Sequence, residues 1–311
     1  MAEEALIDDA AIFVYMGGDQ QVPRHIRRAK IHKSVKIVRA NAFHDCTQLL
    51  YVEFHDGVEI IEVNAFNSCR SLRSIKVLGV KIIKGRAFQD CYRLTDIEFG
   101  NKLETIEHIA FCHCNALTKI KMPCVSTLGK GAFVACYNLS EVEIGEGLRA
   151  LQARAFRDCP NLKRIVLPLK DVIIEDDVFL QCPKLSTVDL IEGIHNTVSS
   201  LHMESWRSEM NDEINSINQI LRTTTRKTLV IQQWMRSAFR QLNHCKEEHR
   251  KIVKEAITLL ELALWKANLS DNDWDWLKTT RGSRKRARKE IFVTSGADVV
   301  IKNVLPFLAM K

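Results

Sequence analysis

Cysteine and histidine side chains stand close together in two places where they could bind a metal ion. Cys245 and His249 are four residues apart, which puts both on one face of a helix. The second group consists of His108, Cys112, His113 and Cys114. A structural zinc site takes about four ligands, commonly paired cysteines, and neither place has that spacing. We therefore predict no metal ion, and we interpret these side chains as packing residues.

Catalytic motifs are missing from the sequence. It contains no glycine-rich phosphate loop, no Gly-x-Ser-x-Gly and no His-Glu-x-x-His. Catalysis needs a nucleophile, a base or a metal converging in one pocket, and residues from distant parts of the chain could still do this. We predict a non-enzymatic protein without a cofactor. The alternative is an enzyme whose site cannot be read from sequence.

Most cysteines belong to a repeat that organises the first two thirds of the chain. Seven of the ten follow a phenylalanine by three residues, and a leucine always stands six residues after that phenylalanine. The phenylalanines recur every 22 or 23 residues, at positions 43, 66, 88, 111, 133, 156 and 179. Such a period, with a Leu-x-x-Ile-x-Ile segment in each unit, is typical of a leucine-rich-repeat solenoid built from short parallel strands.

The units also resemble a known family. The pattern Ala(Val)-Phe-x-x-Cys-x-x-Leu-x-x-Ile/Val, over about residues 26–190, is similar to the BspA-like leucine-rich repeat family. The resemblance implies an interaction module, and several family members lie on cell surfaces. The acidic N-terminus of this chain lacks the basic and apolar regions of a secretory signal, so we do not expect the surface role here.

Composition predicts three parts and an α+β fold class. Residues 1–34 form an N-terminal cap, and residues 35–193 form the solenoid of seven repeats. Residues 194–311 form a helical, coiled-coil-like tail with a basic segment at 278–289. The tail contains all five tryptophans and a strict 4-3 apolar spacing from Ile231 to Ala263, in one long helix or in two joined near His244.

The repeat cysteines allow two interpretations. Neighbouring turns lie about 4.8 Å apart, which is within disulfide range for Cα atoms. Side chains in register point the same way, however, so such a disulfide would be strained. We therefore predict reduced thiols and a cytoplasmic or nuclear protein. No apolar run reaches the roughly 18 residues of a membrane span, so no membrane is expected among its partners.

Two columns of outward-facing strand residues alternate in charge from turn to turn. We interpret them either as a self-paired soluble face or as a concave binding face. The alternation argues against nucleic acid, which favours one sign of charge. The candidate binding residues are Tyr51, Glu53, Ser74, Lys76, Asp96, Glu98, Lys119, Lys121, Glu141, Glu143 and Arg164.

The basic segment carries the whole net charge of +7 and resembles a nuclear import signal. A phosphate-binding patch and a solvated loop are the alternatives. The residues concerned are Arg284, Lys285, Arg286, Arg288 and Lys289.

The leading hypothesis is a protein–protein interaction scaffold that binds unknown proteins through its solenoid. The tail would serve self-association or a second partner. The alternative is a nuclear protein that associates with nucleic acid through the basic segment.

Overall fold

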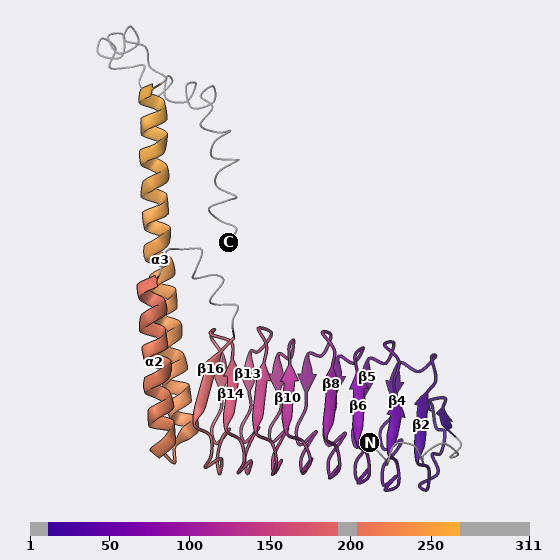
Figure 1. Cartoon of the computed structure of the whole chain (residues 1–311). Coiled ribbons are helices and arrows are strands. Elements are labelled where there is room, and N and C mark those ends of the chain that lie inside the picture. The colour runs from indigo at the N-terminus through magenta and orange to yellow at the C-terminus, as the bar shows by residue number, and fades with distance from the viewer. Residues whose placement is uncertain (1–11, 192–203, 268–311) are drawn as a thin grey trace, which may run out of the picture. The chain divides into compact units, whose positions relative to one another are not determined.

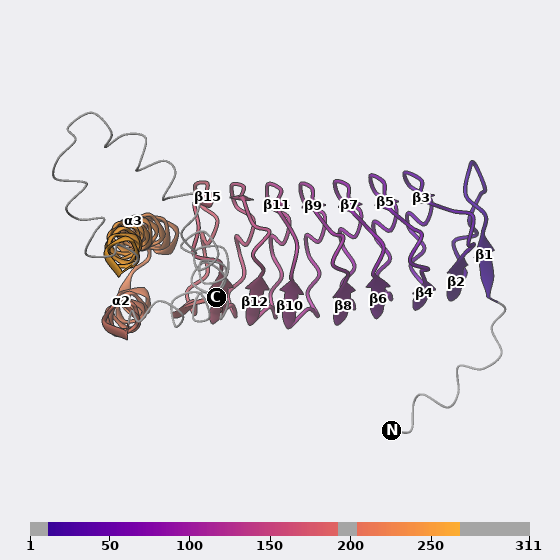
Figure 2. The same ribbon diagram turned by 90° about the horizontal axis from the view of Figure 1, so that it is seen from above.

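The computed structural model describes residues 12–191 and 204–267 of the chain. Residues 12–191 form a solenoid of parallel strands (Figure 1), in which each of the seven full turns contributes one longer and one shorter strand and the N-terminal cap adds the two longer strands β1 and β2. The predicted fold, a leucine-rich-repeat β-solenoid followed by helices, is confirmed. Figure 2 shows the longer and the shorter strands as two rows that face each other along the solenoid.

The longer strands form two sheets with the orders β1-β2-β4-β6-β8 and β10-β12-β14-β16. Their bounds are β1 Phe13–Tyr15, β2 Arg28–Ile31, β4 Tyr51–Glu53, β6 Ser74–Val77, β8 Asp96–Phe99, β10 Lys119–Met122, β12 Glu141–Ile144, β14 Arg164–Leu167 and β16 Thr187–Leu190. In most of them buried and more exposed residues alternate, as expected for strands with one face on the core.

The shorter strands form one uninterrupted seven-stranded sheet in the order β15-β13-β11-β9-β7-β5-β3. Their bounds are β3 Ile37–Val38, β5 Ile60–Ile61, β7 Ile82–Ile83, β9 Thr105–Ile106, β11 Thr127–Leu128, β13 Ala150–Leu151 and β15 Ile173–Ile174. A second sheet on the opposite side of each turn lets the core between the two sheets bury both sets of apolar residues.

A stack of phenylalanine rings runs through this core. The seven repeat phenylalanines are almost fully buried, and neighbouring rings are nearly parallel, with centroids 4.8 to 6.0 Å apart. Tyr15 closes the N-terminal end of the stack, tilted against Phe43 at 5.2 Å, and its hydroxyl accepts a hydrogen bond from the backbone N–H of Arg39. The cap thus supplies an aromatic ring where a preceding turn would have one.

The longer-strand sheet divides between β8 and β10, and a bulky residue accounts for it. Phe99, at the end of β8, packs edge-on against Phe111 of the next turn at 5.8 Å. Phe54 stands in the same repeat position and packs against Phe66, and there β4 pairs with β6 at one position, Tyr51 with Ser74. A ring inserted between two turns holds their strands apart, so backbone pairing is shortened at Phe54 and lost at Phe99.

Two helices follow, α2 (Glu204–Thr223) and α3 (Lys227–Ala267). The predicted apolar stripes are buried along part of their length: Met210, Ile217 and Leu221 in α2, and Ile231, Met235, Ala238 and Leu242 in α3. Of the two arrangements open for the tail, the structure has one long helix, α3, which continues through His244.

The chain divides into two compact units, one comprising residues 1–192 and 208–239 and the other the remainder. Within the first unit, side chains of the helices bond to the last solenoid turn. Thr228 Oγ1 accepts a hydrogen bond from the N–H of Phe179 at 2.9 Å, and Asn218 Oδ1 accepts one from Val188 at 2.8 Å. Because a following turn would offer carbonyl groups at such places, the helices act as the C-terminal cap of the solenoid.

In the second unit the structure describes residues 204–207 of α2 and residues 240–267 of α3. Leu259 is 66% exposed and Leu260 is 44% exposed on this part of α3. Among the described residues, no helix combines the length and the apolar character needed to cross a membrane.

Candidate binding surface

The eleven candidate residues lie on the outer side of the longer strands, which we call the strand face. Strand register aligns them in two columns, as the repeat spacing predicts. Ser74 lies opposite Asp96, and Lys119 lies opposite Glu141, which in turn lies opposite Arg164. The other column aligns Lys76 with Glu98 and Lys121 with Glu143. The gap between β8 and β10 separates the two sets, and Figure 2 shows the turns in a nearly straight row.

The opposite charges on the strand face form ion pairs between neighbouring turns. The pairs are Lys76–Glu98 at 2.9 Å, Lys119–Glu141 at 3.0 Å, Lys121–Glu143 at 2.7 Å and Arg164–Asp189 at 2.5 Å. These side chains are 30 to 73% exposed, so each pair contributes about 0–1 kcal/mol to stability. The pairs fix strand register more than they stabilise the fold, and they leave few free charges along the middle of the face.

The strand face extends further toward the N-terminus than the sequence-based prediction placed it. Lys30 in β2 lies opposite Glu53 and forms an ion pair with it at 2.6 Å. Val14 in β1 lies opposite Lys30, so β1 begins the same column. The half repeat Ile26-x-x-Ala29-x-Ile31 in the cap indicates this extension of the strand face, because it places Arg28 and Lys30 in the two outward columns.

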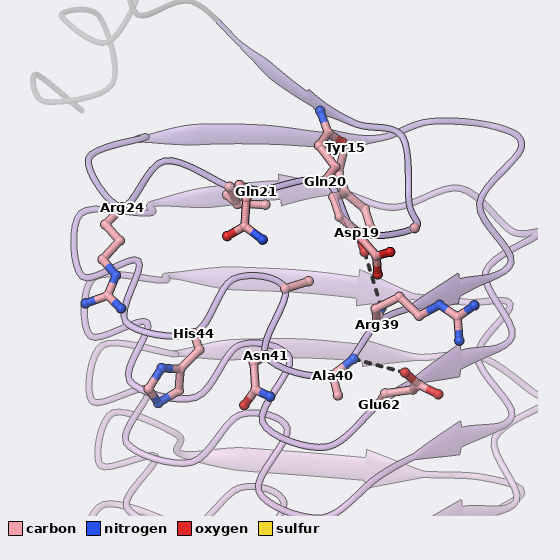
Figure 3. A pocket seen from close by; sticks show the side chains of 13 residues that line it. Tyr15, Asp19, Gln20, Gln21, Arg24, Arg39, Ala40, Asn41, His44 and Glu62 are labelled. Carbon is pink, nitrogen blue, oxygen red and sulfur yellow. Dashed lines mark hydrogen bonds between the residues drawn. The ribbon is translucent and has the colours of Figure 1, made fainter.

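A polar cleft of about 640 Å³ lies between the cap loop and the first turn of the solenoid (Figure 3). Glu62 on its wall accepts a hydrogen bond from the N–H of Ala40 at 3.0 Å. Glu107 accepts one from Gly85 and Glu175 one from Ala153 in the same way, so this bond belongs to the repeat. The cleft has no counterpart in the sequence pattern, because a non-repeating loop forms one wall.

Charges of both signs line the cleft. Figure 3 shows Arg24 and His44 at one end and Asp19 and Glu62 toward the other. Asp45 lies 3.9 Å from Arg24 and 3.4 Å from His44. The cationic end is therefore partly compensated by the protein itself, and the cleft selects no single charge of ligand.

The repeat cysteines are free thiols, as predicted, and their sulphurs bond to the backbone. Cys69 Sγ donates to the carbonyl of Phe43 at 3.1 Å, and Cys182 Sγ donates to that of Phe156 at 3.0 Å. The thiols between them make the same contact at 3.2 to 3.3 Å. Each thiol thus satisfies a carbonyl of the preceding turn inside the core.

Burial makes these thiols, and that of Cys112 outside the repeat, poor nucleophiles and poor metal ligands. Desolvation raises the pKa of Cys46 to about 11 and that of Cys112 to about 12, and it holds the pKa values of Cys69 and Cys114 well above the ordinary range. Because only the thiolate reacts or coordinates, these cysteines serve packing. The described residues contain no group of three or more potential ligands placed to hold a metal ion.

The basic segment 278–289, with the five import-signal residues, lies outside the described residues. Its role stays a prediction.

A solenoid of this repeat length with aligned outward columns defines a leucine-rich-repeat protein. The model of the family described as BspA type leucine rich repeat region matches residues 24–127 and 105–220 in 6 copies, which is more than half of the chain. The chain belongs to this family. The family is generally a non-enzymatic interaction fold.

Several similar solved structures are bacterial leucine-rich-repeat proteins. The leucine-rich repeat protein of T. pallidum is 25% identical, with 47% of this chain and 77% of that chain covered and a TM-score of 0.37. A protein from Eubacterium ventriosum is 24% identical over 56% of this chain and 43% of its own, with a TM-score of 0.45. One from Bacteroides ovatus is 20% identical over 54% and 56%, with a TM-score of 0.36. A comparison with curated proteins finds no match.

Proposed function

We propose that this protein is a non-enzymatic scaffold that binds other proteins through its strand face. One observation supports this most: outward columns of aligned side chains extend over successive parallel strands, from β1 to β8 and from β10 to β16. Such an extended, regular surface is what repeat proteins use to bind partners. The side chains are held by backbone pairing between turns, so the surface is pre-organised and loses little entropy on binding.

The charge pattern favours protein over nucleic acid as the partner of this face. Its lysines and glutamates form pairs along the strands, so the face has no continuous stripe of one sign. A polyanion would need such a stripe to release counterions on binding. A protein surface with alternating charges can instead exchange ion pairs with the face and so set its register.

The experiment is a comparison of variants in affinity capture. The full-length protein would be compared with Lys119→Glu/Lys121→Glu, which places like charges beside Glu141 and Glu143. The matched control is Lys102→Glu/Lys163→Glu, which changes the same charge away from the two outward columns. We expect the strand-face variant to lose most captured proteins and the control to keep them, with circular dichroism confirming that both remain folded. Equal capture by both variants would contradict a role for this face.

A role for the tail in self-association is a separate proposal. Leu259 and Leu260 are exposed on α3, which leaves apolar surface for a partner helix. Multi-angle light scattering of the full chain and of a chain ending at residue 245 measures this: a larger mass for the full chain supports it, and equal monomeric masses contradict it.

We also propose that the basic segment directs nuclear import, with nucleic-acid binding as the alternative role of that segment. Seven lysines and arginines and no acidic residue between Lys278 and Lys289 support the proposal. A fluorescent reporter fused to residues 270–311 should enter the nucleus, and Lys285→Ala/Arg286→Ala should prevent entry. A reporter that stays in the cytoplasm contradicts the import role.

A further inference from the structure

Three apolar side chains are exposed together at the N-terminal end of the strand face. Ile12 is 51% exposed, Val14 41% and Met16 53%. They alternate with Phe13 and Tyr15, which turn toward the core. Alternation along a strand puts Ile12, Val14 and Met16 on one side, so they form a single patch. We call these three residues the apolar triad.

Strand register places the triad within the candidate binding surface. Val14 lies opposite Lys30, and Ile12, one residue before Phe13, falls opposite Arg28. Neighbouring strands are about 4.8 Å apart, so the triad is in contact range of β2. From Lys30 to Glu143 the residues in this column are charged and largely paired with one another, whereas the column begins with the exposed apolar Val14.

The open edge of β1 is closed by a side chain. The amide of Gln20 accepts a hydrogen bond from the N–H of Met16 at 2.6 Å and donates one to the carbonyl of Val14 at 3.2 Å. It thus takes the place of a neighbouring strand, which is one way that proteins protect sheet edges. A partner that meets the triad therefore lies across the strand face and does not add a strand at the edge.

The surroundings of the triad are strongly basic. Residues 12–33, which comprise β1, β2 and the loop between them, contain five lysines and arginines against one acidic residue, Asp19. Lys30 is paired with Glu53, and Arg24 lies near Asp45. Arg27 and Lys33, which flank β2, the strand paired with β1, are exposed and form no ion pair with any residue that the structure describes. An unpaired positive field around an apolar centre favours a ligand that combines negative charge with apolar side chains.

We propose that the N-terminal end of the strand face, centred on the apolar triad, binds an acidic protein segment that carries apolar side chains. The inference rests on the proposed scaffold function and deepens it, because it names where on the face the partner binds and the chemistry of that partner. Apolar side chains of the segment would cover Ile12, Val14 and Met16, and its carboxylates would meet Arg27 and Lys33. Buried apolar contacts at the centre of an interface, surrounded by charge, carry most of the binding energy in protein complexes.

The test is binding of a fluorescein-labelled synthetic peptide of about twelve residues, with leucines spaced between glutamates, to the full-length protein by fluorescence anisotropy. Val14→Ser should weaken binding about tenfold or more. Val63→Ser is the matched control, because Val63 is 39% exposed and lies outside the longer strands. Equal effects of the two substitutions, or no binding of the peptide to the unaltered protein, overturn the proposal.

The contribution of the basic residues to peptide binding is tested in the same anisotropy assay. Arg27→Glu/Lys33→Glu should weaken binding and reduce its dependence on salt, and Lys102→Glu/Lys163→Glu should leave both unchanged. A peptide with glutamine in place of glutamate should bind the unaltered protein more weakly. If the glutamine peptide binds equally well, the acidic character assigned to the partner is wrong.

Other occupants of the surface give distinct results, each of which overturns the proposal. Val14-dependent sedimentation with vesicles of anionic phospholipid indicates a membrane surface. A dimer in light scattering that Val14→Ser abolishes indicates a second copy of this chain. Peptide binding that is absent from the unaltered protein and appears only after deletion of residues 1–11 indicates that this segment, and not a partner, occupies the triad. Loss of capture in the Lys119/Lys121 variant with no effect of Val14→Ser overturns this inference alone and leaves the scaffold function standing.

Discussion

At the scale of single residues, each repeat position meets one physical demand. The phenylalanine ring fills the centre of the turn and stacks on its neighbours, and the cysteine is small enough to pack beside it. A serine could donate the same hydrogen bond to the preceding turn, but burying its hydroxyl would cost more than burying a thiol. These demands recur in every turn, so the same residue types recur, and the repeat is visible in the sequence.

The ring stack predicts that position along the solenoid decides the cost of losing a ring. Phe111 has rings at 5.1 Å on both sides, whereas Phe179 has one, Phe156 at 6.0 Å. Phe111→Ala should lower the free energy of unfolding by about 3–5 kcal/mol, and Phe179→Ala should cost less, because one side of its ring meets the helical cap. Urea denaturation followed by circular dichroism measures both. Equal losses at the two positions would contradict the dependence on the stack.

A strained residue offers a stabilising substitution. Ile109 has a φ of 57°, in the left-handed region that a β-branched side chain strongly disfavours. The same turn position holds Asn41 and Asn64, and asparagine accepts this conformation more readily. Ile109→Asn should therefore raise the free energy of unfolding by about 1 kcal/mol. The reverse change, Asn64→Ile, should lower it by a similar amount in the same urea measurement. A loss in both variants would show that side-chain packing outweighs backbone strain.

At the scale of elements, the buried thiols of the repeat column and of Cys112 make stability depend on pH. Burial raises the thiol pKa values in the folded protein above the value near 9 of an unfolded chain. Below about pH 9 the buried thiols are protonated in both states, and their contribution to the stability of the folded protein is complete. This contribution is lost as pH rises through the pKa values of the folded protein, which are about 11 for Cys46 and about 12 for Cys112. The loss is about 1.4 kcal/mol per buried thiol for each pH unit.

One buried lysine acts in the opposite direction. Desolvation lowers the pKa of Lys227, whose amino group donates to the carbonyls of Leu185 and Leu221. As pH rises from that lowered pKa to 10.5, the contribution of Lys227 to the stability of the folded protein increases. Several thiols outweigh one lysine, so the melting temperature should be constant from pH 7 to about 8.5 and fall steeply above 9. Thiolate absorbance should rise together with unfolding, and thiolates that appear in a still-folded protein would contradict this account.

The elements also show how far the sequence predicts this molecule. Periodic positions fix the strands, the core and the outward columns, because each residue there meets the same neighbours in every turn. The gap between β8 and β10 is not visible in that way, since it depends on how one ring, Phe99, leans on the next turn. The capping roles of Gln20 and Thr228 could not be predicted from the sequence either, because the hydrogen bonds of these residues follow no repeat. The partner of the strand face leaves no periodic signal either.

At the scale of the whole molecule, a solenoid is stable only if both ends are closed. Tyr15 and Gln20 close the N-terminal end. At the other end, Gln232 Nε2 donates to the carbonyl of Ile174 at 2.5 Å, and Thr228 and Asn218 satisfy two further backbone groups. Both caps replace the backbone of a missing turn by polar side chains. Apolar stacking alone would leave those terminal groups unpaired, which is costly in a buried place.

The C-terminal cap gives the last prediction, which separates the two parts of α3. A chain that ends at residue 245 keeps α2 and the buried positions Ile231, Met235 and Ala238, so its melting temperature should match that of the full chain. A chain that ends at residue 191 loses every capping side chain and uncovers the last turn around Phe179, so it should unfold at lower temperature and aggregate through the open edge of β16. Differential scanning calorimetry and light scattering compare the three chains. A finer variant, Thr228→Val, removes one capping oxygen with little change in volume and should cost about 1–3 kcal/mol, because the N–H of Phe179 is left without an acceptor. If the chain ending at 191 is as stable as the one ending at 245, the helices are attached to the solenoid without closing it.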